Sequence, residues 1–471
     1  MPAAAGTVAV ERSPLIIGAG PAGLSAGLEL TRRGVTPRIV ESTGGIGGLA
    51  RTQVDGDWRI DPGGHRFFTR SEEVSDLWRS LLPEDQWLVV PRSSAMLVNN
   101  RYVRYPLMGR DLLSQLALGD VVRGAGGFAW ARFRRQTRIQ PRQSSFKEWG
   151  TTEFGRHWYE MFFDGYVRKT WLADPENIAS DWANQRIKPI GWQLSKHEQA
   201  ADQDVFRYPR CGPGQLWEAA ASRLADSGVD ITLNAMATAA RYNGRTWTVE
   251  TDRGDVLTGD ALFSSMPLRM LVTMLDPAPP AHILAVADQL RHRSLITVAV
   301  ALHKHYDIPY NWVYTPGPNF HAGRIQNYRR WSQDLCPKGF NGTYLGFEYF
   351  LLPDQDLWLA NEHGLGAIVE HDLHQLGFKN PQIEKVMVTR SKFAYPIHDP
   401  ARDRSVVRIR DYLREHYPSL HPIGRNGMHH YDNQDHAMLS AIRSVGKYFG
   451  ENVDPWQVNT DLSYHEQGLR R

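Results

Sequence analysis

Segment 424–438, GRNGMHHYDNQDHAM, gathers three histidines with acidic and amide side chains close to Arg425. These residue types could bind a metal ion, act as a cluster of general bases, or shape a loop that holds a ligand. A zinc site needs side chains that converge, whereas the adjacent His429 and His430 diverge on either a helix or a strand. We therefore predict no metal site, and the two metal-free alternatives stay open. Asp432 or Asn433 is the expected N-cap of the helix that follows.

A second candidate site is a glycine turn near the start of the chain. A short buried strand, Leu15 to Ile17, precedes glycines in the G-x-G-x-x-G spacing, Gly18, Gly20 and Gly23, and a helix follows. Gly18 permits the tight turn, Gly20 lets the backbone approach a pyrophosphate, and Gly23 allows the helix to pack closely on the strand. The next strand ends at Glu41, 41 − 23 = 18 residues beyond the last glycine. A carboxylate there would accept hydrogen bonds from ribose hydroxyls, so the unit predicts a dinucleotide, and both FAD and NAD satisfy it.

The stretch after Glu41 favours FAD as that dinucleotide. STGGIGGLARTQVDGDWRIDPGGHRFFT carries four glycines and Arg51 directly beyond the strand end, in place of a plain helix. It resembles the second FAD fingerprint of the amine oxidase, protoporphyrinogen oxidase and UDP-galactopyranose mutase superfamily. The resemblance implies that Gly48 and Arg51 line the pyrophosphate and that DPGGH passes the isoalloxazine. His65 in that motif either donates a hydrogen bond near the reactive ring or supports the loop, and both interpretations stay open.

Composition sets the broad class of protein. At 471 residues the chain is long enough for two or three domains and for the burial of a large cofactor. A formal charge of +3 gives no strong attraction to nucleic acid. The apolar runs are far shorter than the roughly 18 residues that span a bilayer, and no secretory segment is recognisable. With two cysteines, Cys211 and Cys336, we expect a cytoplasmic protein without an integral membrane segment.

The segment from Phe154 to Ile190 narrows the resemblance within the superfamily. It is similar to the uridine-binding region of UDP-galactopyranose mutases, and the matching positions are Gly165, Tyr166, Lys169, Trp171 and Arg186. Val167 and Thr170 depart from the family pattern, and one extra residue separates Trp171 from Arg186. An aromatic ring can stack on a pyrimidine and a guanidinium can bind two phosphate oxygens. The alternative is a helical subdomain in which these aromatic residues form the core.

Further matches follow in the same order as in the mutases. GRIQNYRRW places Arg324 at a phosphate-binding position of that family, and FAYPIHD places Tyr395 at the position of a substrate tyrosine. In segment 424–438 the matching residues are Arg425, Tyr431 and Asp435, whereas His429 and Asn433 depart from the pattern. The resemblance implies that this segment holds the flavin and the diphosphate.

The expected architecture is α/β: a Rossmann-type FAD-binding domain with a helical insertion and an antiparallel-sheet substrate domain. Residues 1–95, 206–285 and 424–471 are expected to form the FAD-binding domain. Residues 96–205 form the helical insertion on the substrate side, and 286–423 form the antiparallel sheet. Within the insertion, the arginine-rich RGAGGFAWARFRRQTRIQPR is interpreted as a solvated face in preference to a partner site.

The resemblance implies an FAD-dependent enzyme that isomerises a nucleotide sugar between pyranose and furanose forms through a reduced-flavin N5 adduct. The implied catalytic residues are His65, Arg186 and Arg324. The expected substrate-binding residues are Tyr166, Trp171, Arg186, Arg324, Tyr395 and Tyr431, and the expected cofactor-binding residues are Gly18, Gly20, Gly23, Glu41, Gly48, Arg51, His65, Arg425 and Asp435.

Two other functions stay open. One is an FAD-dependent oxidoreductase that passes hydride from an amine, an alcohol or a C–C bond to the flavin, and the other is a flavin-holding protein without turnover. We expect a small-molecule partner, a nucleotide sugar, and no nucleic acid, and homodimerisation is left open.

Overall fold

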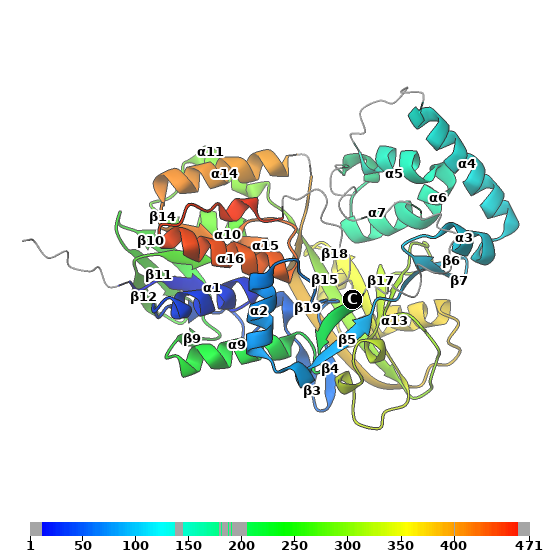
Figure 1. Ribbon diagram of the computed structural model, residues 1–471, viewed down its shortest axis with the longest axis horizontal. Helices are drawn as coiled ribbons and strands as arrows, with labels where there is room; N and C mark the ends of the chain where they lie inside the picture. The colour runs from blue at the N-terminus through cyan, green and yellow to red at the C-terminus, as the bar shows by residue number, and fades with distance from the viewer. Residues whose placement is uncertain are drawn as a thin grey trace, which may run out of the picture. The chain divides into compact units, whose positions relative to one another are not determined.

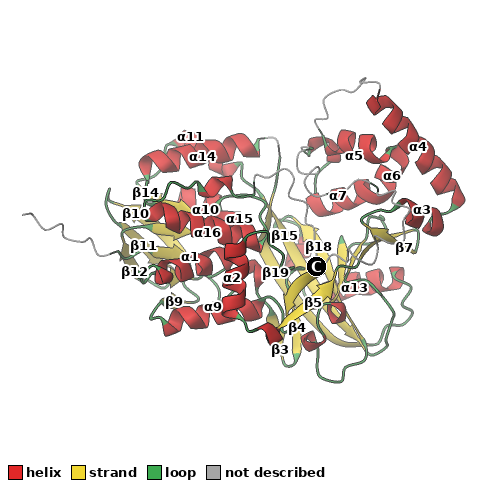
Figure 2. Ribbon diagram, in the orientation of Figure 1, coloured by secondary structure: helices red, strands yellow, loops and turns green. Residues whose placement is uncertain are grey.

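The computed structural model describes residues 12–136, 145–178, 180, 187, 190, 205–399 and 401–459. They fall into two compact units. Unit 1 comprises Met1–Gly48, Trp217–Asp288 and Val406–Val458, and unit 2 comprises Leu49–Leu216, Gln289–Ser405 and Asn459–Arg471. Figures 1 and 2 show the elements of each unit.

Unit 1 is organised by a five-stranded sheet in which every pairing is parallel. Its strands are, in spatial order, β20 (Leu420–Pro422), β13 (Leu262–Ser264), β1 (Leu15–Ile17), β2 (Arg38–Val40) and β9 (Asp230–Thr232). Leu15, Ile16 and Ile17 are all buried, as expected for a strand with neighbours on both edges and helices over its faces. This sheet confirms the Rossmann-type part of the predicted fold.

Helices and a second sheet complete unit 1. Two helices pack side by side, α1 (Pro21–Arg32) and α16 (Gln434–Tyr448). The others are α9 (Gly214–Asp226), α10 (Leu268–Thr273), α11 (Ala281–Asp288), α14 (Arg402–His416) and the one-turn α15 (Gly424–Gly427), with α9 and α14 each beginning in unit 2. The second sheet has the order β12 (Val256–Gly259), β11 (Trp247–Thr251), β10 (Ala237–Tyr242), β14 (Leu275–Asp276).

Unit 2 is built on a seven-stranded sheet, antiparallel except where β16 runs parallel to β6. Its spatial order is β19 (Ile383–Pro396), β15 (His292–Leu302), β18 (Thr343–Leu351), β17 (Arg324–Asn327), β16 (Trp312–Tyr314), β6 (Ser94–Val98), β7 (Arg101–Tyr105). Every residue of β15 is buried, and helix α13 (Glu362–Gln375) packs apolar side chains against one face of the sheet. The predicted antiparallel sheet is confirmed.

The smaller elements of unit 2 include two two-stranded sheets and a group of helices. The two sheets pair β3 (Gln53–Asp55) with β4 (Trp58–Ile60) and β5 (Trp87–Pro91) with β8 (Val205–Pro209). Two helices lie outside the helical cluster in the sequence, α2 (Glu72–Leu81) and α12 (Asp356–Leu359). The helical cluster consists of α3 (Gly109–Gln115), α4 (Leu118–Gln136), α5 (Phe146–Phe154), α6 (Arg156–Tyr159), a π-helical turn (Glu160–Asp164) and α7 (Gly165–Trp171).

Glycines allow the helical cluster to pack closely. A Cβ atom on Gly124 of α4 would lie 1.9 Å from the indole Nε1 of Trp158, and one on Gly150 would lie 2.3 Å from the Tyr159 ring. Helix α5 begins at a Ser145 N-cap that forms a capping box with Glu148. The predicted helical insertion is therefore present in the described residues 109–136 and 145–171.

The division into units differs from the expected domain boundaries: residues 206–216 and 459–471 are assigned to unit 2 and 286–288 to unit 1, and two longer segments also change place. Residues 49–95 belong to unit 2, because β5 pairs with β8 and β6 adds to the seven-stranded sheet. Residues 406–423 belong to unit 1, because β20 pairs with β13. Assignment of unit 1 to the cofactor and unit 2 to the substrate stays a proposal.

Candidate cofactor and substrate sites

In unit 1 the glycine turn lies between β1 and α1 and is shaped by backbone contacts. Gly18 has φ +103°, a conformation that favours glycine. A Cβ atom on Gly23 would lie 1.8 Å from the Gly18 carbonyl oxygen, so the first turn of α1 packs directly on the strand end. Gly20 is the N-cap of α1 and approaches the backbone of Gly48, whose Cα would lie 3.7 Å from a Gly20 Cβ.

This geometry fits a dinucleotide pyrophosphate. The first backbone N–H groups of a helix are without partners inside the helix and carry a partial positive charge, so they attract an anion. Because Gly20 and Gly48 have no side chains, the backbone at this helix end is accessible to a phosphate group.

Glu41 lies directly after β2 and its carboxylate is tied to the same turn. Oε2 accepts a hydrogen bond from the Ala19 backbone N–H at 2.9 Å, and Oε1 accepts from the N–H and the hydroxyl of Thr43 at 2.9 and 2.8 Å. Oε1 also accepts from the Ser42 hydroxyl at 3.2 Å, so Oε2, with a single donor among the described residues, is the oxygen that can still accept a ribose hydroxyl. The carboxylate is thus oriented before any nucleotide binds.

Segment 424–433 packs against the same end of α1. Gly424 has φ +70°, and a Cβ atom there would lie 2.7 Å from the Cβ of Ala22 in α1. The Arg425 Nε donates to the Asp432 carbonyl at 2.7 Å, and its guanidinium lies 5.7 Å from the centre of the Tyr431 ring. Asp435 is buried in the first turn of α16, whose N-cap is Asn433. The one-turn helix α15 was not expected from the sequence.

Unit 2 contains the second candidate site, a buried ion pair next to a tyrosine. Arg324 of β17 donates from Nε to Glu348 of β18 at 2.6 Å, and its Nη2 contacts the same carboxylate and the Tyr395 hydroxyl, the latter at 3.0 Å. Burial raises the pKa of Glu348, and the charge and hydrogen bonds of Arg324 act in the opposite direction. Arg324 is only 13% exposed, so this pair interacts with little screening by water.

Aromatic rings surround the Arg324 guanidinium. Its central carbon lies 5.1 Å from the Trp312 ring and 5.0 Å from the Phe350 ring. These distances permit cation–π attraction and limit the directions in which the guanidinium can turn.

The DPGGH loop at residues 61–65 is fixed to the same network. The Gly64 N–H donates to Glu348, and the Pro62 carbonyl accepts from the Thr297 hydroxyl at 3.2 Å. His65 donates from Nδ1 to the Gly63 carbonyl at 2.9 Å, a bond that supports the loop. Glu348 therefore links this loop to Arg324.

Asp61, at the start of that loop, is a buried carboxyl group. It accepts from the Thr52 hydroxyl at 2.8 Å and from the Tyr208 hydroxyl. Burial raises the pKa of Asp61 to about 7, although both hydrogen bonds oppose this shift. The carboxyl group is therefore partly protonated near neutral pH.

The predicted uridine-binding residues of α7 differ in their exposure and in their contacts. Tyr166 is half-buried and meets Tyr314 edge to face, with ring centres 5.3 Å apart. Trp171 is 4% exposed, and the guanidinium of Arg293 covers its ring at 4.4 Å, so this geometry disfavours stacking on a base. Arg186 lies outside the described residues.

Lys169 and Gly165, which also matched the mutase pattern, have structural contacts. The Lys169 ammonium donates to the carbonyls of Thr315 and Gly317 at 2.7 and 2.8 Å, and burial lowers its pKa to about 8. A Cβ atom on Gly165 would lie 2.3 Å from the Pro316 carbonyl. Both residues thus hold α7 against loop 315–322.

Sequence reasoning identified Arg324 and Tyr395, which the structure brings together, but missed Glu348, Arg293 and Asp61. A signal existed for Glu348, since a charged residue in the apolar strand TYLGFEYF needs a buried partner. Arg51 is half-buried in unit 2, whereas Gly48 ends the first segment of unit 1.

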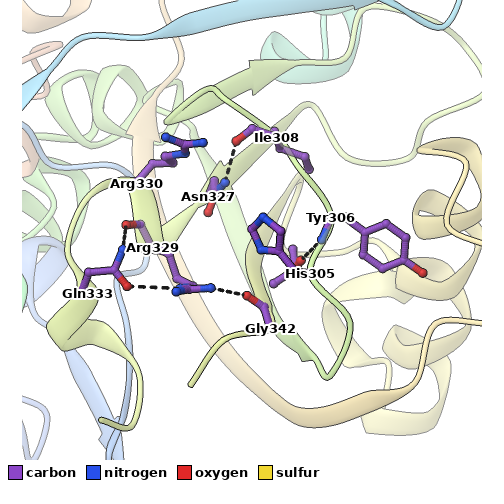
Figure 3. Close-up of a pocket in the computed structure, with 9 residues that line it drawn as sticks. His305, Tyr306, Ile308, Asn327, Arg329, Arg330, Gln333 and Gly342 are labelled. Carbon is purple, nitrogen blue, oxygen red and sulfur yellow. Dashed lines mark hydrogen bonds between the residues drawn. The ribbon is translucent and has the colours of Figure 1, made fainter. Parts of the chain in front are cut away.

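A surface cavity of about 130 Å³ also occurs in unit 2 (Figure 3). Its lining includes His305, Tyr306, Asn327, Arg329 and Gln333, and none of the predicted site residues contributes to it. Across the described ranges, no three histidine, cysteine, aspartate or glutamate side chains are grouped to bind a metal ion. Among the described helices, none has both the length and the apolar character needed to cross a bilayer.

A family model described as flavin containing amine oxidoreductase matches residues 21–315, more than half of the chain. The chain belongs to this family. It is a flavoenzyme family, and with the dinucleotide-binding geometry of unit 1 the cofactor is FAD. Gly18, Gly20, Gly23, Glu41 and Gly48 stay the residues predicted to hold its adenosine diphosphate part.

Individual relatives are more distant. Protoporphyrinogen oxidase 2, chloroplastic/mitochondrial, of Arabidopsis thaliana is 24% identical over 169 residues, which cover 35% of this chain. The match spans only 33% of that relative's length.

Solved structures of similar fold cover nearly the whole chain. A reduced UDP-galactopyranose mutase superposes with a TM-score of 0.83 at 22% identity, covering 97% of this chain and 100% of the mutase. A proposed protoporphyrinogen oxidase from Exiguobacterium sp. 255-15 superposes with a TM-score of 0.73 at 15% identity, covering 93% of this chain and 99% of the oxidase. A fatty acid isomerase from P. acnes superposes with a TM-score of 0.62 at 14% identity, covering 94% of this chain and 100% of the isomerase. These likenesses establish the fold of this family member.

Proposed function

We propose that this flavoenzyme isomerises a nucleoside-diphosphate sugar between its pyranose and furanose forms. The observation that carries the proposal is the Arg324 cluster, a guanidinium held by Glu348 and Tyr395 and bordered by aromatic rings. With Nε and Nη2 donating to Glu348 and Tyr395, Nη1 is the group that would donate to a phosphate oxygen, and aromatic rings suit the sugar and base on either side of a diphosphate. The fold similarity to reduced UDP-galactopyranose mutase supports the same choice.

The chain's own contribution would be to stabilise the departing diphosphate. FAD in its reduced form, when bound, supplies the electron pair that displaces the diphosphate from the anomeric carbon. Arg324 would donate hydrogen bonds to the diphosphate as negative charge develops on it. Because Glu348 and the aromatic rings already fix the guanidinium, little side-chain entropy is lost when it binds. Tyr166, Arg186 and Tyr431 stay predicted substrate-binding residues, and His65 stays a predicted catalytic one.

The test is isomer formation by the purified protein reduced with dithionite. The substrates are UDP-, dTDP- and GDP-sugars, and the products are separated by chromatography. We expect one of them to interconvert, and Arg324→Lys, which keeps the charge but loses the planar fork, should lower kcat/KM by about ten-fold or more. Formation of no isomer from any sugar would contradict the proposal.

A second function is favoured by the family match itself. Residues 21–315 match flavin-containing amine oxidoreductases, and the Arabidopsis relative is an oxidase by name. If this chain catalyses net oxidation, a substrate amine, alcohol or C–C bond would bleach the oxidised flavin without any added reductant. Stopped-flow absorbance of the flavin distinguishes the two functions.

A further inference from the structure

Helix α4 (Leu118–Gln136) in unit 2 has one face that packs into the helical cluster. Val121, Gly124 and Ala131 are buried on this face, and Gly124 contacts the Trp158 ring. The helix packs against α5 and α6. Its position in the cluster is therefore fixed independently of the opposite face.

The opposite face of α4 exposes large apolar side chains. Leu118, Val122, Trp130 and Phe133 are 78%, 63%, 62% and 56% exposed. At 3.6 residues per turn they fall within about 120° of one another around the helix. The rings of Trp130 and Phe133 stack with centres 5.8 Å apart and an interplanar angle of 24°. We call these four residues the apolar stripe.

Arginines border the apolar stripe on both sides. By the same helical periodicity, Arg123 and Arg134 follow one edge and Arg132 follows the other. The helix carries four arginines and one aspartate, a net charge of 4 − 1 = +3. Asp120, already included in that sum, pairs with Arg123 at 3.2 Å, and Glu153 of α5 offsets a further charge by pairing with Arg135 at 2.6 Å.

This pattern differs from the solvated face expected from the sequence. A solvated helix face presents charged and polar side chains, whereas the apolar stripe exposes a tryptophan and a phenylalanine. Leucine and aromatic residues flanked by arginine are typical of helices that lie in the interface of an anionic membrane. In such helices the aromatic rings enter the headgroup region of the bilayer, and the arginines contact lipid phosphates.

A second copy of the chain fits less well. A two-fold symmetric contact through the apolar stripe would place the arginine borders of one copy close to those of the other. Like charges across an interface are unfavourable, whereas an anionic lipid surface complements them.

We propose that the apolar stripe of α4 docks the protein on the surface of an anionic lipid bilayer, with α4 parallel to the membrane plane. The proposal concerns a peripheral contact and does not depend on the reaction that the enzyme catalyses. It would bring the enzyme to substrates or products that reside at a membrane surface.

Co-sedimentation of the full chain with vesicles tests the proposal. The protein should bind vesicles of phosphatidylcholine mixed with phosphatidylglycerol, bind pure phosphatidylcholine weakly, and dissociate as salt is raised. Trp130→Ser with Phe133→Ser should weaken binding to the anionic vesicles by about ten-fold or more. Arg132→Gln with Arg134→Gln should weaken it less and reduce its salt dependence.

The matched control is Leu359→Ser, which changes another highly exposed apolar side chain, on α12, and should bind as the wild type does. Because the substituted side chains are exposed, the variants should keep the wild-type melting temperature. Absence of wild-type binding to anionic vesicles would overturn the proposal. So would unchanged vesicle binding by the Trp130/Phe133 variant, particularly if that variant converts a dimer to a monomer in sedimentation equilibrium.

Discussion

The glycine turn of unit 1 and the Arg324 network of unit 2 differ in the atoms that shape them. The turn is shaped by backbone atoms, and contacts such as Gly23 against the Gly18 carbonyl leave no space for a side chain. The network is shaped by buried charged groups. The Glu348 carboxylate accepts hydrogen bonds from the side chains of Arg324 and Gln326 and from the Gly64 N–H. The first region should therefore be sensitive to added atoms, and the second to lost charge.

The largest effect is expected from adding one carbon atom to the turn. Gly23→Ala would place a methyl group 1.8 Å from the Gly18 carbonyl, so the strand and helix must separate and FAD retention should be lost. The measurement is flavin absorbance per protein after purification. Gly45→Ala is the control, because a Cβ atom there meets nothing within 4 Å. Full FAD content in Gly23→Ala would show that the turn does not hold the cofactor.

Loss of charge from Glu348 should destabilise unit 2. Glu348→Gln leaves Arg324 without its carboxylate in a buried position, which should lower the free energy of unfolding by about 3 kcal/mol. Urea unfolding measures the change. In Arg324→Met with Glu348→Leu neither charge is present, so the stability lost by this double variant should be smaller, by about 1 to 3 kcal/mol, than the sum of the losses in Arg324→Met alone and Glu348→Leu alone. Additive losses would mean that the two side chains act independently.

Asp61 should make stability depend on pH. Its folded pKa of about 7 lies above the ordinary value of 3.8, so the protonated form is favoured by folding. The stabilisation is complete below about pH 4 and is lost as pH rises toward 7, and between pH 5 and 8 the loss is roughly 2 to 3 kcal/mol. Thermal unfolding across this range should show a steeper decline for the wild type than for Asp61→Asn. Equal slopes would contradict the prediction.

The smallest effect is expected at the edge of the network. Tyr395→Phe removes the hydroxyl that accepts from Arg324 but keeps the ring, so the unfolding free energy should fall by about 1 kcal/mol. Tyr306→Phe is the control, since its stacking on Phe378 depends on the ring alone. Equal losses in the two variants would show that the Arg324–Tyr395 bond contributes nothing.

The two regions also differ in how well they could be predicted. The glycine turn was predicted because its three glycines and Glu41 lie within one strand–turn–helix–strand unit, Leu15 to Glu41, whose spacing is a recognisable pattern, although Gly48 and Gly424 also pack against it. In unit 2, Arg324 and Tyr395 were found by resemblance, but their partner Glu348 was not. A carboxylate 24 residues from its arginine leaves no periodic pattern, since strand pairing decides which residues meet.

Burial explains the other differences between the sequence-based predictions and the structure. Trp171 and Lys169 belong to residue types that often bind nucleotides, and only the structure places one under Arg293 and the other against loop 315–322. The helical cluster was predicted from its periodicity. Exposure of Trp130 and Phe133 was not, because helical periodicity does not distinguish a face that packs on a neighbour from one that is left exposed.

The order of strands in unit 1 has a consequence for protein synthesis. β13 pairs with β1 on one edge and with β20 on the other, and β20 follows it in the sequence by more than 150 residues. While the ribosome makes the intervening part of unit 2, the β13 edge has no strand to pair with and α1 lacks α16. The nascent chain must therefore protect an open sheet edge until residues 420–448 emerge, and we expect it to aggregate most readily, and to need chaperones most, during that interval.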